Sequence, residues 1–264
     1  MEQPVSWIIP RHPRPDYPLF VFLPGMDGSG QLYDRQIKNL APYFDLRCLA
    51  ISPQYLGDWE ELSTLVIALL EQELKRQSRK VYLCGESFGG CLALKIATKS
   101  PKLLKKLILV NPASSFNQRP LLSLGIAITQ IMPDFIHGSS ALTILPFLAA
   151  LGRISREDRR SLLKAMQYVP PKTISWRLSQ LQRFQVSASE LKALQLEVLV
   201  IASQGDRLLP SVAEAKRLIQ QLPAAKLTIL PNSGHACLLE TDIHLKDILH
   251  HHACLPRSLP AKSH

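Results

Sequence analysis

Ser87 stands in the turn Gly85-Glu86-Ser87-Phe88-Gly89, between an apolar β-like run and a helix-like run. Glycine two residues before and two after the serine allows a turn so tight that larger side chains would collide with neighbouring backbone. Such a turn exposes the serine over the edge of a sheet, at a helix N-terminus whose unpaired N–H groups favour developing negative charge. We therefore predict that Ser87 is a nucleophile on a nucleophile elbow.

Two further residues have the chemistry that activates a serine hydroxyl, which is a poor nucleophile until a base removes its proton and an acid orients that base. Asp206 follows one predicted strand, and His235 follows the next, directly after a Ser-Gly pair. The order serine, acid, histidine is the one expected after a nucleophile elbow. We predict His235 as the base and Asp206 as the orienting acid. The competing residues lie in less suitable segments: His12, His137, His250–His252, Asp27 and Asp34.

An enzyme of this kind also needs two N–H donors for the oxyanion. The residue after the nucleophile, Phe88, supplies one backbone N–H, and Met26 in the glycine-rich loop 24–30 is the predicted source of the other. The same loop invites a phosphate-binding interpretation, but Gln31 follows Gly30 where a nucleotide-binding loop has lysine, and the glycine spacing is not that of a dinucleotide site. We expect no metal and no cofactor.

The elements that position these residues alternate along the chain. Short apolar runs indicate strands, and apolar residues at helical spacing indicate helices between them. This alternation predicts an α/β fold with a mostly parallel sheet flanked by helices. The predicted strands are Leu19–Pro24, Leu46–Ile51, Val81–Cys84, Leu107–Val110, Leu196–Ala202 and Lys226–Leu230, and the predicted helices are Trp59–Gln77, Phe88–Lys99, Val212–Leu222 and Ala236–Leu249.

The alternation stops between Ala113 and Leu194, in a stretch too long to be a structureless loop. We predict a helical cap over residues 114–194, inserted before the strand that carries the acid, with residues 1–113 and 195–264 as the core. Leu121–Met132 and Ala141–Leu151 are apolar stretches too short to span a bilayer. Arg156–Met166 and Ile174–Phe184 have the pattern of amphipathic helices.

The chain is strongly basic, with a formal net charge of +10, and the cap holds ten Lys or Arg against four acidic residues. A basic, apolar cap predicts peripheral contact with an anionic membrane, with a solvated face as the alternative. No nucleic-acid-binding motif accompanies the charge, so we expect no nucleic acid partner. Five scattered cysteines and a polar, proline-rich start without an apolar run favour reduced thiols and a cytoplasmic location without a signal peptide.

Three segments together resemble the hydrolase half of plastid phytyl ester synthases and their cyanobacterial single-domain relatives, within the α/β-hydrolase superfamily. They are Phe22-Leu23-Pro24-Gly25-Met26-Asp27-Gly28-Ser29-Gly30, Gly85-Glu86-Ser87-Phe88-Gly89-Gly90-Cys91-Leu92-Ala93-Leu94 and Asn111-Pro112-Ala113-Ser114-Ser115-Phe116. The resemblance implies the α/β-hydrolase fold and acyl transfer or ester cleavage on lipids, including phytol and diacylglycerol. The plant members also carry an acyltransferase-like half with an HxxxxD motif. This sequence has no such half, so ester hydrolysis is the expected activity.

Taken together, the sequence predicts a serine hydrolase that cleaves carboxylic esters of hydrophobic, lipid-like small molecules through an acyl-enzyme. The cap's apolar runs suit an acyl or prenyl chain, although they are equally typical of a cap that forms its own core. The alternatives are acyl transfer, as in a phytyl or wax ester synthase, and other chemistry of the same triad, such as C–C bond hydrolysis or perhydrolysis. A non-catalytic binding protein is the remaining class, and three filled triad positions argue against it.

Overall fold

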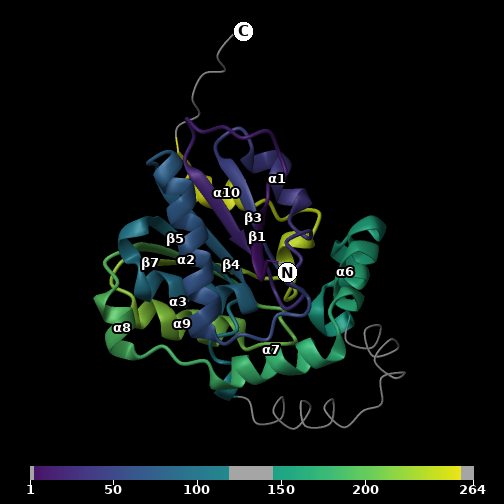
Figure 1. Cartoon of the computed structure of the whole chain (residues 1–264). Coiled ribbons are helices and arrows are strands. Elements are labelled where there is room, and N and C mark those ends of the chain that lie inside the picture. The colour runs from purple at the N-terminus through teal and green to yellow at the C-terminus, as the bar shows by residue number, and fades with distance from the viewer. Residues whose placement is uncertain (1–2, 119–144, 257–264) are drawn as a thin grey trace.

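A single seven-stranded sheet organises the protein, in a computed structural model that describes residues 3–118 and 145–256. Its strand order is β1-β3-β2-β4-β5-β6-β7 (Figure 1). β1 runs antiparallel to β3, and the pairs from β3 through β7 are parallel. The predicted fold class, a mostly parallel sheet flanked by helices, is therefore confirmed. The strands are β1 (Val5–Ile8), β2 (Leu19–Leu23), β3 (Asp45–Ile51), β4 (Val81–Glu86), β5 (Leu104–Val110), β6 (Glu197–Ser203) and β7 (Ala225–Leu230).

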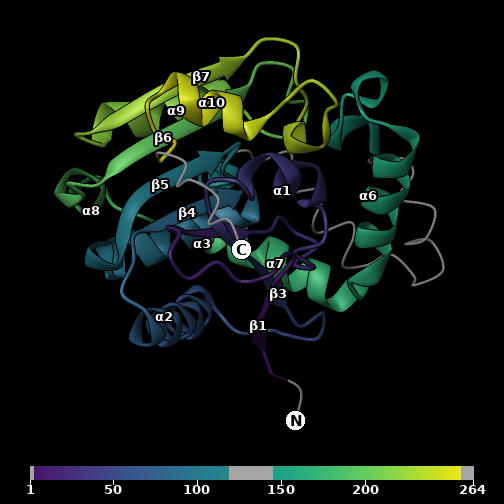
Figure 2. The same ribbon diagram turned by 90° about the horizontal axis from the view of Figure 1, so that it is seen from above.

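Both faces of the sheet are buried because its strands are apolar on both sides. In β2, Leu19, Val21 and Leu23 enter one core, whereas Phe20 and Phe22 enter the other, as expected for side chains that alternate along a strand. The first core is covered by α2, α3 and α9, and the second by α1 and α10 (Figures 1 and 2). These helices are α1 (Asp34–Leu40), α2 (Trp59–Arg76), α3 (Phe88–Lys99), α9 (Ser211–Gln221) and α10 (Leu245–His251), with a 3-10 turn η1 (Pro101–Leu103) between α3 and β5.

The described parts of the predicted cap (residues 114–194), namely residues 114–118 and 145–194, are mostly helical. α7 runs below the sheet in the view of Figure 1, and α6 rises beside it. The predicted stretch Leu121–Met132 lies outside the described residues, and of Ala141–Leu151 only residues 145–148 are described as α-helical. The cap elements are η2 (Phe116–Gln118), η3 (Leu151–Arg153), α6 (Arg156–Tyr168), α7 (Pro171–Arg183) and α8 (Ala188–Ala193).

The structure departs from the sequence prediction most clearly after β7. The single helix predicted over Ala236–Leu249 is wrong: a 3-10 turn η4 (Cys237–Leu239) is followed by non-helical residues, and α10 begins only at Leu245. The physical reason is Glu240, which forms an antiparallel bridge with Ile154 and turns a fully buried side chain back toward the preceding loop. The helix-like spacing of leucines could not reveal this pairing.

Among the strands and α-helices of the described residues, β1, α1 and α8 were not predicted. β1 pairs with β3 at the edge of the sheet, within the proline-rich start of the chain. α8 begins with a capping box in which Ser187 and Glu190 satisfy each other's backbone N–H groups. Among the described residues, none of the helices combines the length and the apolar composition needed to cross a bilayer.

Candidate active site

Ser87 occupies a strained turn between β4 and α3. Its φ is 54°, a left-handed conformation that non-glycine residues rarely adopt. The flanking glycines are required by close packing, because a Cβ on Gly85 would lie 2.2 Å from the Gly89 carbonyl oxygen, and one on Gly89 would lie 2.1 Å from the Leu23 carbonyl oxygen. The turn is held by backbone bonds, since the Ser87 N–H donates to the Val110 carbonyl at 3.0 Å. The elbow geometry expected from the glycine spacing is present.

The three predicted triad side chains form one hydrogen-bonded chain. Ser87 Oγ lies 2.8 Å from His235 Nε2, and His235 Nδ1 lies 2.7 Å from Asp206 Oδ2. The side chains of His235 and Asp206 are 5% and 1% exposed, so this chain is almost completely shielded from water. In this arrangement the imidazole can remove the serine proton, and the carboxylate can hold the imidazole in the required tautomer.

Asp206 is held as an ionised acceptor by several donors. Its Oδ1 accepts the backbone N–H groups of Leu208 and Leu209 at 2.8 and 3.0 Å, and Ser211 Oγ donates to Oδ2. Burial by itself would raise the pKa of this carboxyl. The hydrogen bonds from His235, Ser211 and the Leu209 N–H outweigh burial, and the pKa of Asp206 lies below its ordinary value. The group is therefore charged at neutral pH and able to stabilise an imidazolium on His235.

Two buried residues that the sequence prediction missed support the loop of His235. Asn111, at the end of β5 with a φ of 42°, donates from Nδ2 to the His235 carbonyl at 2.7 Å and to Ser203 Oγ at 2.9 Å. The Glu240 carboxylate accepts the Gly234 N–H at 2.7 Å and the Ser233 hydroxyl at 2.9 Å. The sequence held one signal, an asparagine directly after the β5 strand. Nothing in the local sequence signalled Glu240.

The loop 24–30 after β2 adjoins the nucleophile. A Cβ on Gly25 would lie 3.8 Å from Ser87 Cβ. Within the described residues, neither the Met26 N–H nor the Phe88 N–H donates to another protein group. The loop is tied to the sheet because the Ile51 N–H donates to the Gly28 carbonyl at 2.8 Å. Asp27 stays within the loop, where it accepts the Ser29 backbone N–H at 2.9 Å.

Glu86, next to the nucleophile, is a second carboxyl group near His235. The residue is half-buried, and its Oε1 is shielded from solvent without a hydrogen-bond partner among the described residues. Burial raises the pKa of Glu86, the nearby His235 opposes that rise and Asp27 adds to it, so that the pKa is about 7. The buried Tyr33 hydroxyl, which shares this side of the sheet, also lacks a partner in the described part of the chain.

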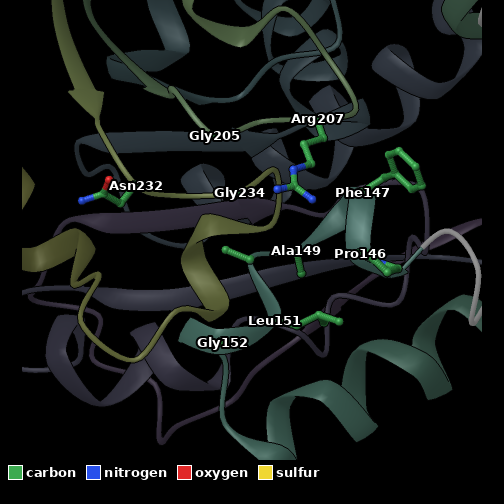
Figure 3. Close-up of a pocket in the computed structure, with 10 residues that line it drawn as sticks. Pro146, Phe147, Ala149, Leu151, Gly152, Gly205, Arg207, Asn232 and Gly234 are labelled. Carbon is green, nitrogen blue, oxygen red and sulfur yellow. The ribbon is translucent and has the colours of Figure 1, made fainter.

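A cavity of about 330 Å³ lies between residues 146–152 and the loops that carry Asp206 and His235 (Figure 3). Gly205 and Gly234, the neighbours of Asp206 and His235, line it together with the cap residues 146–152. In Figure 3, the Arg207 side chain reaches across the cavity toward Gly234, and Phe147 lies beside it. Ser87, Asp206 and His235 are not among the residues that line this cavity.

The competing residues are placed less favourably. All five cysteines are buried, and burial raises the pKa of the Cys48 thiol to about 12 and that of Cys84 and Cys91 well above the ordinary value. A protonated thiol is a poor nucleophile. His252 is engaged elsewhere, since its Nε2 lies 2.6 Å from Thr228 Oγ1. His12 is exposed, Asp34 begins α1, and His137 lies outside the described residues.

The chain is similar to curated plant proteins. It is 33% identical over 273 residues to phytyl ester synthase 1, chloroplastic, and 28% identical over 260 residues to phytyl ester synthase 2, chloroplastic, both from Arabidopsis thaliana. The two alignments cover 93% and 88% of this chain. The chain spans only 39% and 37% of the length of these relatives. The resemblance expected from the three segments around the loop, the elbow and Asn111 is therefore confirmed.

The fold is also found in solved structures. An esterase from Exiguobacterium antarcticum superposes with a TM-score of 0.76 at 16% identity, with 94% of each chain covered. At this identity the likeness concerns the fold alone. The model of the alpha/beta hydrolase family matches residues 20–244, which include the elbow, the acid and the histidine. The chain belongs to the alpha/beta hydrolase family.

Proposed function

We propose that the protein is a serine hydrolase that cleaves carboxylic esters of hydrophobic, lipid-like molecules through an acyl-enzyme. Ser87 is the nucleophile, His235 the general base and Asp206 the residue that orients it. The backbone N–H groups of Met26 and Phe88 bind the oxyanion. The observation that carries the proposal is the continuous chain from Ser87 Oγ to His235 to Asp206, with distances of 2.8 and 2.7 Å.

The reaction follows from this geometry. His235 Nε2 takes the hydroxyl proton while Ser87 Oγ attacks the ester carbonyl carbon, and the carbonyl oxygen becomes an oxyanion. The oxyanion accepts the two free N–H groups, which are fixed in place before the reaction and cost no reorganisation. The tetrahedral intermediate collapses as the C–O bond of the ester breaks, and His235 gives its proton to the leaving alcohol. A water molecule then repeats the sequence on the acyl-enzyme and releases the acid.

A hydrophobic substrate is supported by the side chains around the elbow. The Trp59 ring lies 4.6 Å from the Phe88 ring and 5.4 Å from the Phe184 ring of the cap, centroid to centroid. Met26 packs against the hydrophobic core that contains these three rings. These contacts place aromatic and thioether groups next to the proposed oxyanion donors, so the surroundings of the reacting carbonyl favour an apolar acyl or alkyl chain over a sugar or a nucleotide.

Labelling with a fluorophosphonate probe tests the nucleophile. We expect the wild-type protein to be labelled and Ser87→Ala to be unlabelled and inactive on p-nitrophenyl esters. Ser100→Ala is the matched control, because Ser100 lies at the end of α3 and caps no backbone group with its side chain. Asp206→Asn, which favours the wrong histidine tautomer, is expected to lower kcat by about 10⁴-fold. Equal labelling of wild-type protein and Ser87→Ala would refute the assignment.

A second function, acyl transfer to a long-chain alcohol, is favoured by the similarity to the Arabidopsis phytyl ester synthases. The two functions share the acyl-enzyme and differ in whether water or an alcohol attacks it. A cap that excludes water favours transfer. Incubation with a fatty acyl ester and phytol, followed by mass spectrometry of the products, separates them: free acid alone supports hydrolysis, and phytyl ester supports transfer.

We further propose that the cap contacts an anionic membrane through α6. Arg156, Arg160 and Lys164 are all exposed and follow one another at four-residue spacing, which places them on one face of the helix. Tyr168, 57% exposed, continues the same face. Arg153 does not belong to this set, because it is paired with Glu240 and Asp242 at 2.6 Å each.

Co-sedimentation with vesicles tests the membrane proposal. Pelleting with vesicles that contain phosphatidylserine, and not with pure phosphatidylcholine vesicles, is expected for the wild type and should be lost in Arg156→Glu/Arg160→Glu. The control is Lys192→Glu, a change of the same sign in α8 of the cap. Wild-type protein that stays in the supernatant would end this proposal.

The five buried, unpaired thiols further support a reducing compartment such as the cytoplasm.

A further inference from the structure

Arg177 is an unusual residue for the interior of a protein. It belongs to α7 of the cap, yet its side chain is buried to 2% exposure against the loop 24–30 of the core. Among the described residues, none of the carboxylates lies within ion-pair distance of its guanidinium. Burial lowers the pKa of Arg177 to about 10, and only the field of Asp27 opposes this. A buried cation without an ion-pair partner is costly, so its contacts are expected to serve a purpose other than stability.

The contacts of Arg177 are with backbone. Nη1 donates to the Met26 carbonyl at 2.7 Å, and Nη2 donates to the Ser52 carbonyl at 3.3 Å. Gly28, with a φ of 64°, lies directly against the guanidinium, because a Cβ there would be 2.6 Å from Nη1. Arg177 thus connects the residue that carries one proposed oxyanion donor to the chain just after β3.

The residue that carries the second proposed donor, Phe88, is also contacted through the interface between α7 of the cap and the core, which we call the seam. Trp59 Nε1 donates to the Gln180 carbonyl of α7 at 2.8 Å, and the Trp59 ring lies against Phe88. From the cap side, Trp176 Nε1 donates to the Gly57 carbonyl at 3.2 Å. Three side-chain donors therefore cross the seam around α7, and two of them contact a residue whose N–H is proposed to bind the oxyanion.

We propose that Arg177 is a positioning residue: by docking α7 onto the loop 24–30, it fixes the Met26 backbone, so that seating of the cap and assembly of the oxyanion hole are one event. This inference rests on the proposed serine hydrolase function. A fixed Met26 carbonyl restrains the backbone dihedrals of that residue and therefore the direction of its N–H. Because the oxyanion exists only in the tetrahedral state, loss of this restraint lowers kcat more than it weakens substrate binding.

Kinetics with a tetrahedral-state analogue distinguish this role from a structural one. In Arg177→Met, kcat is expected to fall roughly tenfold to hundredfold with KM within about twofold of wild type, a part of the loss measured when an oxyanion donor is removed outright. The affinity for a trifluoromethyl ketone, which forms an oxyanion on the serine, should fall by the same factor as kcat/KM. Arg177→Lys, which keeps a single donor, should retain an intermediate kcat. Arg183→Met, an exposed change on the same helix, is the control and should match wild type.

Amide hydrogen exchange provides a readout that needs no activity. Peptides covering residues 24–31 should exchange faster in Arg177→Met than in wild type or Arg183→Met, while those of β4 and α3 stay unchanged. The inference would be overturned if folded Arg177→Met had the same kcat, the same affinity for the analogue and the same exchange rates as the wild type. If Arg177→Met does not fold, the same result in Arg177→Lys would overturn it. Wild-type protein that neither turns over esters nor labels at Ser87 would instead overturn the proposed function and the inference with it.

Discussion

The two loops that meet at Ser87 are shaped by different parts of the protein. In the elbow, Gly89 packs against backbone atoms, since a Cβ there would lie 2.1 Å from the Leu23 carbonyl oxygen and 2.5 Å from that of Pro24. In the loop 24–30, Gly28 packs against the end of the Arg177 side chain, since a Cβ there would lie 2.6 Å from Nη1. Both glycines are enclosed, but one faces atoms that cannot move and the other faces a flexible group. Ser87 is therefore held by the core alone, whereas the loop 24–30 is held by the core and also by Arg177 of the cap.

This difference has a functional meaning for an enzyme with an inserted cap. The contacts of the elbow glycines are with β2, the residue after it and α3, all within the core. The loop 24–30 is bonded to the sheet through the Gly28 carbonyl and to α7 through the Met26 carbonyl, whose partner Arg177 lies 151 positions later. Under the proposed function, we expect a substrate that displaces α7 to alter the proposed oxyanion site while leaving Ser87 in place.

The largest effect is expected from Gly89→Ala. The new methyl group would meet carbonyl oxygens of β2 and the following residue, so the β2–elbow contact has to open. We expect a loss of at least about 4 kcal/mol in the free energy of unfolding, the range of severe core defects, and no measurable esterase activity. Urea unfolding followed by circular dichroism measures the change. Gly152→Ala is the control, because a Cβ at Gly152 meets no atom within 4 Å and should alter stability by less than about 0.5 kcal/mol. Equal stability of Gly89→Ala and Gly152→Ala would show that the backbone around Gly89 moves aside as easily as a flexible side chain does.

The contrast between the two loops also explains how much could be predicted from sequence. The elbow is local: two glycines, a strand before and a helix after identify Ser87, and strand–loop positions identify Asp206 and His235. The supports of these residues are not local. Arg177, Asn111 and Glu240 act on residues 151, 124 and 6 positions away, through contacts that exist only in the folded chain. Periodicity therefore predicted the sheet and most of the helices, but it extended one helix through Glu240, whose buried carboxylate ends up bonded to the loop of His235.

Glu86 tests whether the side chains of the elbow are as tightly enclosed as its glycines. Its pKa of about 7 in the folded protein is above the ordinary 4.5, so the folded state holds the proton more tightly than the unfolded state does. The contribution of Glu86 to the stability of the wild type therefore falls by about 3 kcal/mol as pH rises from about 4.5 to 7, and it is constant above that. Glu86→Gln lacks this titration. The difference in unfolding free energy, variant minus wild type, should therefore rise by about 2.5 kcal/mol between pH 5 and pH 8.

Urea unfolding of both proteins at several pH values measures this difference. Only its change with pH is informative, because the cost of burying an amide at this position is the same at every pH. Glu71→Gln, the same change on the exposed side of α2, is the control and provides the baseline for the substitution itself. A difference for Glu86→Gln that follows this baseline at every pH would mean that the carboxyl reaches solvent or a partner, and that the elbow is less closed than its glycines imply.

The smallest effect, and the sharpest test of the comparison, is expected from Gly28→Ala. Alanine at a φ of 64° costs about 1 kcal/mol in backbone strain, and displacement of the guanidinium weakens the bond to the Met26 carbonyl by about another 1 kcal/mol. We expect a loss of about 2 kcal/mol in the free energy of unfolding, well below the loss expected at Gly89, together with a drop in kcat of about tenfold. The same substitution in an Arg177→Met background should cost only the backbone part, so a double-mutant cycle should show coupling of about 1 kcal/mol. Strict additivity would mean that Gly28 and Arg177 act independently, and that the loop 24–30 owes its shape to its own backbone, as the elbow does.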